Sequence, residues 1–388
     1  FDSEYPSTEA IFALISPEDC KYYTDFSNGA VAAVNKKING KNCSIWKRSN
    51  IPALSLKEDY APISSDLTNT IEVGTIKSWS DISNWYSDLV KKNLKLDKIT
   101  KDTFNTIFPK GTANLSDDDK AKAIYAYIEK NITYSSLDFR QSGYVPQKPS
   151  KTITTKLGDC KDVSTLFVAL SQCAGLKSNL VLVSTNDNGF NSMRLPSRDF
   201  NHCIVQTKID NKVVFLELTD RYLPYRMLPS SLYNANALVI SFDKKENETS
   251  KLINIPFDAA VQNRLRTTSV VTLDDKSKVF VNTHTIEGAT KSYYNELFSD
   301  ATTKEIREKE IEKGYNKQLQ KLVSLQSVKL LSNELFDKAL TYETKFSIND
   351  NLQKVGALKI TEIPFIDKVY TRDIIAAENR KFDINYFF

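Results

Sequence analysis

The stretch Gly158-Asp159-Cys160-Lys161-Asp162 stands directly before a run of apolar residues and decides the fold of the middle of the chain. The apolar positions recur at the spacing of one helix face: Val163, Leu166, Phe167, Leu170 and Ala174. This pattern predicts a helix that begins at Cys160 and is capped at its far end by Gly175. The free N–H groups and the positive dipole end of a helix N-terminus stabilise a thiolate. Cys160 is therefore the candidate nucleophile.

A cysteine nucleophile needs a base, and the chain offers two histidines, His202 and His284. His202 stands at the start of a predicted strand, which the turn residues Asp210-Asn211 and a second predicted strand follow. We take His202 as the candidate base. His284 lies in a later predicted strand without an accompanying nucleophile, and we expect it to be a surface or half-buried strand residue.

The order of these residues resembles that of the transglutaminase-like superfamily of papain-type thiol enzymes, with His202 42 positions after Cys160 and Glu217 15 after His202. Further short motifs resemble those of the bacterial branch that carries a DUF3857 domain before its transglutaminase core. They are Phe139-Arg140-Gln141-Ser142-Gly143, Pro146-Gln147, Leu195-Pro196, Phe200-Asn201-His202 and Leu218-Thr219-Asp220-Arg221-Tyr222-Leu223-Pro224. The upstream sequence is similar to the end of that preceding domain at Trp46, Asn50-Ile51-Pro52-Ala53-Leu54 and Tyr60-Ala61-Pro62.

The resemblance implies an α+β fold, in which a helix bearing the cysteine packs on an antiparallel sheet bearing the histidine and a carboxylate. We expect three parts: residues 1–76 as the C-terminal part of a DUF3857-like β domain, 77–229 as the catalytic core, and 230–388 as a β-rich domain. The family is typical of the bacterial cell envelope, which implies a periplasmic or surface-exposed protein. The chain starts at Phe1 without an initiator Met, so we expect that a preceding segment was removed.

Two carboxylates compete for the third catalytic position, which in this superfamily is usually an Asp in an Asp-x-Thr context. Here the word reads Glu217-Leu218-Thr219-Asp220. A two-residue turn at Asp210-Asn211 would pair His202 with Thr219, which places Glu217 on the face of His202. Asp220 would lie on the opposite face, unless a bulge or an odd loop shifts the register. We favour Glu217, with Asp220 as the alternative.

If Cys160 and His202 meet, the chemistry is acyl transfer. The thiolate attacks an amide or ester carbonyl, the imidazolium protonates the leaving group, and water or an amine resolves the thioester. The backbone N–H of Cys160 can serve the oxyanion. Gln141 is a candidate second donor, although a loop glutamine without a catalytic part fits the sequence equally well.

Hydrolysis by a peptidase or amidase is the favoured activity, because nothing in the sequence identifies a binding surface for an amine acceptor. A catalytically inactive binding or scaffolding protein and a true cross-linking transglutaminase remain alternatives. The expected substrate is a protein, a peptide or a peptidoglycan-like amide.

The composition limits the other possibilities. The 388 residues include 52 basic and 48 acidic ones, and this near balance gives no case for nucleic acid binding. No apolar stretch reaches the length of a membrane span, and no Cys-x-x-Cys or paired-histidine spacing predicts a metal or other cofactor. Five cysteines argue against a disulfide scaffold, although Cys20 and Cys43 could pair. We expect Cys173 and Cys203 to be buried, and Trp85 to be a core residue of a helix capped by Ser80.

Overall fold

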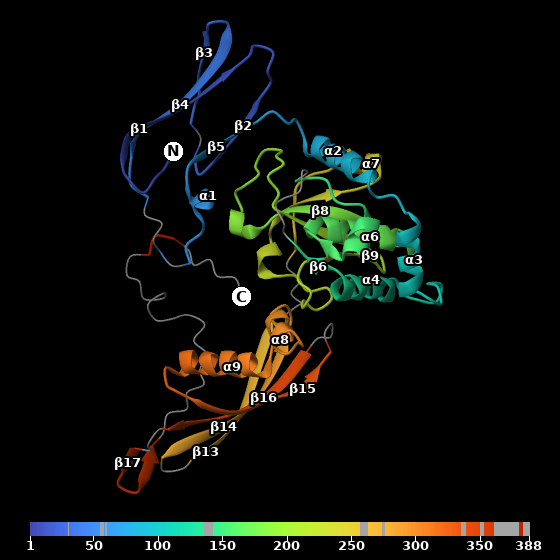
Figure 1. Ribbon diagram of the computed structural model, residues 1–388. Coiled ribbons are helices and arrows are strands. Elements are labelled where there is room, and N and C mark those ends of the chain that lie inside the picture. Colours follow the sequence, from blue (N-terminus) through green and yellow to red (C-terminus); the bar gives the residue numbers. More distant parts are fainter. Residues whose placement is uncertain are drawn as a thin grey trace. The chain divides into compact units, whose positions relative to one another are not determined.

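The computed structural model describes residues 1–29, 31–54, 58, 60–135, 143–256, 263–273, 276–334, 339–349, 353–360 and 380–382 (Figure 1). The chain divides into two compact units. The first unit comprises Phe1–Thr219, Pro229–Phe257 and Ala376–Phe388, and the second comprises Asp220–Leu228 and Asp258–Ile375. Both units combine helices with antiparallel sheets, so the expected α+β class is confirmed. The division into parts at residues 76 and 229 stays a prediction.

The first unit opens with short strands. β4 (Lys41–Ile51) is the middle strand of an antiparallel sheet, between β1 (Ser7–Ser16) and β3 (Val34–Ile38). The turn between β3 and β4 is Asn39-Gly40, and both residues have a positive φ, as a two-residue hairpin of this kind requires. β2 (Tyr23–Ser27) pairs with β5 (Thr70–Gly74), and the single helical turn α1 (Ser64–Leu67) precedes β5.

Five helices of the first unit accompany its main sheet: α2 (Trp79–Lys91), α3 (Lys98–Ile107), α4 (Asp117–Asn131), α5 (Pro149–Thr155) and α6 (Cys160–Cys173). Ser116 caps α4, because its side chain accepts from the N–H of Asp119. The expected cap of α2 is wrong. Ser78 rather than Ser80 caps it, since Ser78 and Asp81 form a capping box, and the Ser80 hydroxyl donates to the Glu248 carbonyl instead.

The main sheet of the first unit is antiparallel and has the strand order β10 (Lys212–Leu216), β9 (His202–Ile209), β8 (Ser178–Ser184), β11 (Asn236–Ile240) and β12 (Ile253–Asn254). α6 packs on β8 and β9 through fully buried side chains, among them Leu166, Phe167, Leu170, Leu180 and Ile204. Burying so much apolar surface is what fixes α6 against the sheet. A short parallel pair, β6 (Thr133–Tyr134) and β7 (Leu157–Gly158), leads into α6.

The connections of the first unit include three single-turn helices: η1 (Asn186–Asn188), η2 (Ser230–Leu232) and α7 (Lys244–Asn247). The second unit is built on a four-stranded antiparallel sheet, ordered β13 (Arg264–Leu273), β14 (Ser277–Glu287), β16 (Ala339–Asn349) and β15 (Ser324–Asn333). Side chains along β14 alternate between buried and partly exposed, so one face carries the core. α8 (Lys291–Leu297) and α9 (Lys304–Leu319) add Leu297, Ile311, Tyr315 and Leu319 to that core.

The last described strands of the chain, β17 (Gln353–Val355) and β18 (Leu358–Ile360), form a separate hairpin. A membrane-crossing helix is not found among the described residues, since none of their helices combines the required length with the required apolarity.

Candidate active site

Cys160 is the first residue of α6, at the position that the sequence predicts. Asp159 is the N-cap, and its side chain accepts from the N–H of Asp162, while the Asp162 carboxylate accepts from the N–H of Asp159 at 3.1 Å. Gly158 precedes the cap at a crowded position: a Cβ there would lie 3.1 Å from side-chain atoms of both Asp162 and Thr152, which is closer than an ordinary contact. The thiol is half-buried and stands where the helix dipole favours an anion.

The Asp162 carboxylate ties the start of α6 to the segment before it. The side chain is completely buried, and its oxygens also accept from the backbone N–H of Gln147 at 2.7 Å and from its side-chain amide at 3.0 Å. Charge-assisted hydrogen bonds of this kind are stronger than neutral ones. Asp162 therefore acts as a positioning residue for Cys160, and it explains why Pro146-Gln147 accompanies the cysteine motif.

His202 and Glu217 are directly hydrogen-bonded, with 2.6 Å between Nε2 and Oε2. The hairpin of β9 and β10 brings them together, and its register runs without a bulge from Ile209 opposite Lys212 to Val205 opposite Leu216. Glu217 is buried, and its Oε1 accepts from the N–H groups of Leu218 and Thr219 and from the Thr219 hydroxyl. The contact that the hairpin predicts between His202 and Glu217 is present.

Asp220 hydrogen-bonds to other groups than His202. Its Oδ1 accepts from the N–H of Tyr222 at 3.0 Å, and its carbonyl accepts from the N–H of Leu223. Its Oδ2 accepts from the hydroxyl of Ser292, which belongs to the second unit together with Asp220. These contacts are those of a carboxylate that organises a turn.

The charge state of the pair follows from its surroundings. Burial lowers the pKa of His202, but the charge of Glu217 and the hydrogen bonds with Cys160 and Glu217 outweigh it and raise the pKa to about 10. Burial opposes ionisation of Glu217, yet the charge and hydrogen bond of His202 and the bonds from Thr219 hold its pKa below the ordinary value. At neutral pH the pair is therefore an imidazolium next to a carboxylate, with Cys160 as a further hydrogen-bond partner of the imidazolium.

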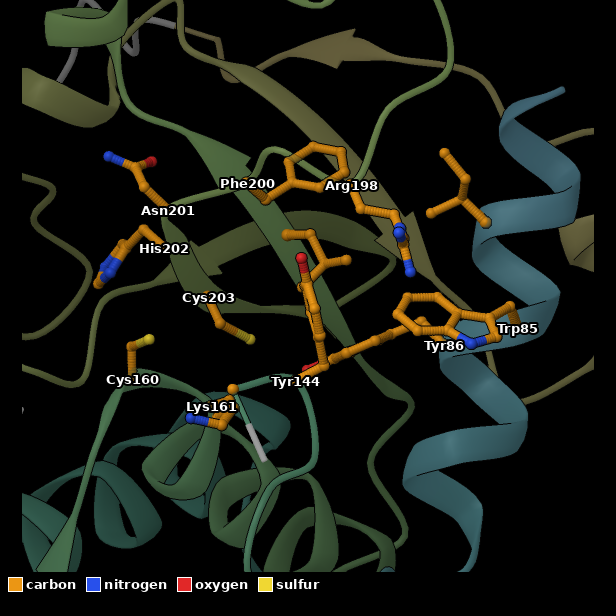
Figure 2. Close-up of a pocket in the computed structure, with 13 residues that line it drawn as sticks. Trp85, Tyr86, Tyr144, Cys160, Lys161, Arg198, Phe200, Asn201, His202 and Cys203 are labelled. Carbon is orange, nitrogen blue, oxygen red and sulfur yellow. The ribbon is translucent and has the colours of Figure 1, made fainter. Parts of the chain in front are cut away.

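Cys160 and His202 lie at one end of a pocket (Figure 2). Aromatic side chains and one guanidinium line the rest of it: Trp85, Tyr86, Tyr144, Phe200 and Arg198. The expectation that Trp85 is a core residue is wrong, because this ring is only partly buried and faces the pocket, whereas the adjacent Tyr86 is buried. The apolar stripe of α2 thus continues from the core onto the pocket wall.

The other cysteines differ from Cys160. All five thiols are free, so Cys20 and Cys43 are not bonded to each other in the structure. Cys203 is buried as expected, and this burial raises its pKa well above the usual value. Cys173, which we expected to be buried, is half-buried, and its pKa is raised mainly by burial as well. Neither environment favours a thiolate.

The two remaining sequence candidates are Gln141 and His284. Gln141 lies outside the described residues. His284 is buried in the second unit, more deeply than expected, and its ring nitrogens contact the hydroxyls of Thr267 and Tyr315 at 2.9 and 2.7 Å. Burial lowers its pKa to about 4, so it is a neutral structural histidine. All five cysteines belong to the first unit.

Sequence reasoning missed Tyr134, whose strand β6 runs beside Gly158. Partial burial, and then the charges of Cys160, Asp159 and Glu217, raise the pKa of Tyr134 to about 12, so its hydroxyl stays protonated at neutral pH. No local motif marks this tyrosine.

As for metals, the part of the chain that the structure describes holds no group of three or more His, Cys, Asp or Glu side chains that could bind one.

One family model matches part of the first unit. Residues 106–217 match the family model described as the transglutaminase-like superfamily. This segment is therefore similar to the transglutaminase-like superfamily, and it lies within a protein of mixed helix and sheet. The matched segment ends at Glu217 and contains both Cys160 and His202. No match was found among curated proteins.

Solved structures resemble the chain at low identity. One, provisionally described as a protease of Parabacteroides distasonis, is 15% identical, covers 90% of this chain and 68% of that one, and has a TM-score of 0.47. A second, provisionally described as a cysteine protease of Cytophaga hutchinsonii, is 15% identical. The match covers 66% of this chain and 82% of that one, with a TM-score of 0.28. A third, described as a TGase, is 18% identical. The match covers 48% of this chain and 43% of that one, with a TM-score of 0.25.

Proposed function

We propose that the protein is a thiol hydrolase that cleaves an amide or ester bond in a protein or peptide. Cys160 is the nucleophile, His202 is the general acid and base, and Glu217 orients His202. The observation that carries the proposal is the 2.6 Å hydrogen bond between His202 and Glu217, with Cys160 as the other partner of the imidazole. A nucleophile, a base and an orienting carboxylate in this arrangement are what acyl transfer requires.

The reaction has two stages. The Cys160 thiolate attacks the carbonyl carbon, and the His202 imidazolium gives its proton to the leaving amine or alcohol, so that a thioester remains. His202 then takes a proton from water, whose oxygen attacks the thioester, and the thiolate leaves with the electron pair. The oxyanion faces the first N–H groups of α6, which have no partner within the helix. Gln141 remains a candidate for a second donor.

Throughout, the buried Glu217 keeps one ring nitrogen bound and stabilises the imidazolium charge. Hydrolysis is preferred over cross-linking, because none of the described residues that line the pocket points to a binding site for an amine. A peptidoglycan-like amide is the other substrate class under this proposal. The sequence resemblance to proteins with a preceding DUF3857 domain supports a place in the cell envelope, and we propose that location too.

The proposal is tested with p-nitrophenyl acetate, an activated ester that needs no specific substrate pocket. We expect rapid release of p-nitrophenol, an acetyl group on Cys160 in peptide mass spectra, and slow return of the free thiol as water resolves the thioester. An added primary amine should leave that return unchanged. Cys160→Ala and His202→Ala should each abolish the acetylation.

Matched variants make the test specific. Cys173→Ala, at the other end of α6, and His284→Ala, in the second unit, should react like wild type. Absence of acetyl transfer to Cys160 in the folded protein would contradict the proposal and favour a binding or scaffolding role. Strong acceleration of thioester breakdown by the amine would instead indicate a cross-linking transglutaminase.

A further inference from the structure

Arg198 lies against two aromatic rings in the pocket that contains Cys160 and His202 (Figure 2). Its guanidinium carbon lies 5.6 Å from the ring centroid of Trp85 and 5.8 Å from that of Tyr144. The two rings also contact each other edge to face, with 5.5 Å between their centroids. Stacking of this kind restricts the plane of a guanidinium but leaves the N–H groups along its edge available.

Among the described basic residues that line the pocket, Arg198 is the one without a carboxylate partner. The other basic groups that line it are Lys161, which forms an ion pair with Asp159, and His202, which pairs with Glu217. Within the described ranges, Arg198 forms neither an ion pair nor a hydrogen bond with a carboxylate, and no described carboxylate lines this pocket. Arg198 is exposed, and a guanidinium without a carboxylate partner of its own is suited to binding a carboxylate from outside, because its fork of donors matches the two oxygens.

A larger groove adjoins the pocket and shares Tyr144 and Arg198 with it. Residues 72–76, after the start of β5, form one side of this groove, and residues 191–193 and 195–199 form another. The N–H of Leu195 donates to Glu72 at 2.9 Å, which fixes the two sides to each other. Arg198 thus stands where the pocket opens into the groove, and a chain bound at Cys160 has room to continue past it.

We propose that Arg198 binds a carboxylate of the substrate, and that the enzyme therefore selects chains with an acidic group near the bond that Cys160 attacks. This inference rests on the proposed thiol hydrolase function. The carboxylate belongs either to an acidic side chain or to the end of a chain. The continuing groove favours the acidic side chain, since a chain end would leave the groove empty.

Three alkylating probes of nearly identical size separate these possibilities. Iodoacetyl-glutamic acid α-amide carries only a side-chain carboxylate, iodoacetyl-glutamine carries only a chain-end carboxylate, and iodoacetyl-glutamine amide carries neither. In each case the Cys160 thiolate forms a C–S bond at the iodomethylene carbon, and iodide leaves with the electron pair. The measured quantity is the second-order rate of Cys160 labelling, read from peptide mass spectra.

We expect wild type to react at least about tenfold faster with the side-chain carboxylate probe than with the neutral probe, as one charge-assisted hydrogen bond would give. Arg198→Gln should remove this preference, so that the side-chain carboxylate probe and the neutral probe label Cys160 at similar rates. Arg194→Gln is the matched control, because this arginine lies on the same loop, pairs with Asp25 and does not line the pocket. It should keep the full preference.

A preference for the chain-end carboxylate that depends equally on Arg198 would retain carboxylate binding and assign it to a chain end. Equal wild-type rates for all three probes, or a preference that survives in Arg198→Gln, would overturn the inference. Failure of the underlying function looks different: Cys160 would then react with the neutral probe no faster than Cys20, whatever residue stands at position 198.

Discussion

At the scale of single residues, the site depends on which carboxylate reaches His202. The sequence predicts Glu217 from the parity of a two-residue turn, and the structure has that turn, with positive φ at both Asp210 and Asn211. Because no bulge interrupts the ladder, alternation along the strands puts Glu217 on the face of His202. The longer side chain of Glu replaces the usual Asp, and three donors from Leu218 and Thr219 hold it still.

Replacement of this carboxylate tests its role. Glu217→Gln should lower the rate of Cys160 acetylation by p-nitrophenyl acetate by about 100-fold or more, because the imidazolium loses its counter-charge. Asp220→Asn should leave that rate near the wild-type value and lower only the stability of the second unit, where Asp220 bonds to Ser292. The opposite pattern of rates would show that Asp220 orients His202.

The raised pKa of His202 also predicts how stability depends on pH. The imidazolium stabilises the folded state fully below the unfolded pKa of about 6.5, and this contribution is lost as the pH rises through about 10. Wild type should therefore lose up to about 1.4 kcal/mol per pH unit across this window relative to His202→Gln. Urea unfolding followed by tryptophan fluorescence measures this, since Trp46, Trp79 and Trp85 all lie in the first unit. A stability difference that stays constant from pH 6.5 to pH 10 would rule out the buried ion pair.

At the scale of elements, α6 shows what a sequence can and cannot predict. Its start at Cys160 and its glycine cap, where Gly175 has a φ of 75°, follow from local patterns of capping and periodicity. The link from Asp162 to Gln147 does not, because it joins segments whose approach depends on the whole core. Trp85 illustrates the same limit: helical spacing places it on the apolar face of α2, but not at the point where that face meets a pocket.

The buried Asp162 carboxylate should matter more than an ordinary cap. Asp162→Ala should destabilise the first unit by about 2–4 kcal/mol, because the buried N–H groups of Gln147 and Asp159 lose their acceptor. Asp119→Ala, at the same helix position in α4 but exposed, should cost about 1 kcal/mol or less. Tryptophan fluorescence in urea compares the two variants. Equal losses would show that Asp162 is only a cap.

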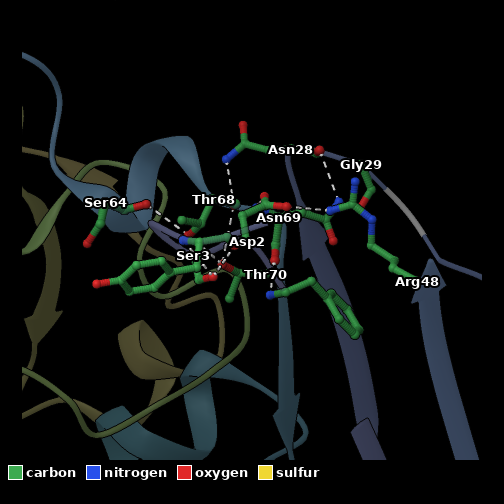
Figure 3. Close-up of polar contacts among 11 residues, drawn as sticks. Asp2, Ser3, Asn28, Gly29, Arg48, Ser64, Thr68, Asn69 and Thr70 are labelled. Atoms are coloured by element: carbon green, nitrogen blue, oxygen red, sulfur yellow. Dashed lines mark hydrogen bonds and ion pairs between the residues drawn. The ribbon is translucent and has the colours of Figure 1, made fainter. Parts of the chain in front are cut away.

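Polar contacts also fix elements that no motif in the sequence marks. Asn69 lies just before β5. Its backbone N–H donates to Asp2 at 2.6 Å, and its side-chain amide donates to the Gly29 carbonyl at 2.8 Å (Figure 3). Arg48 of β4 donates to the other oxygen of Asp2 at 2.8 Å. Asp2 thereby connects the two small sheets of the N-terminal segment, a contact between residues far apart in the sequence.

At the scale of the whole molecule, the two compact units divide the histidines between them. His202 belongs to the first unit and His284 to the second, and their environments shift the pKa in opposite directions. The sequence favours His202 for the candidate site, because this histidine lies near the cysteine motif and a hairpin carboxylate. It does not predict the burial of His284, because the covering residue Tyr315 comes from α9, far along the chain.

Acid should therefore weaken the second unit through His284. Its folded pKa of about 4 lies below the unfolded value of about 6.5, so the neutral ring stabilises the fold above pH 6.5, and this contribution is lost as the pH falls toward 4. Hydrogen exchange of β14 and β16 amides, corrected for intrinsic rates, should show opening that increases over this range. His284→Gln should show a flatter dependence on pH, and an equally steep one would exclude His284 as the cause.

The central claim, that His202 and the start of α6 make Cys160 a nucleophile, is tested most directly by limiting iodoacetamide on the folded protein at neutral pH, with peptide mass spectrometry of all five cysteines. Cys20 is the internal reference, because it is half-buried like Cys160 but stands apart from the site. We expect Cys160 to be labelled first in wild type, and to fall to the rate of Cys20 in His202→Ala. Labelling of Cys20, Cys173 or Cys203 before Cys160, or a Cys160 rate that His202→Ala leaves unchanged, would contradict the account.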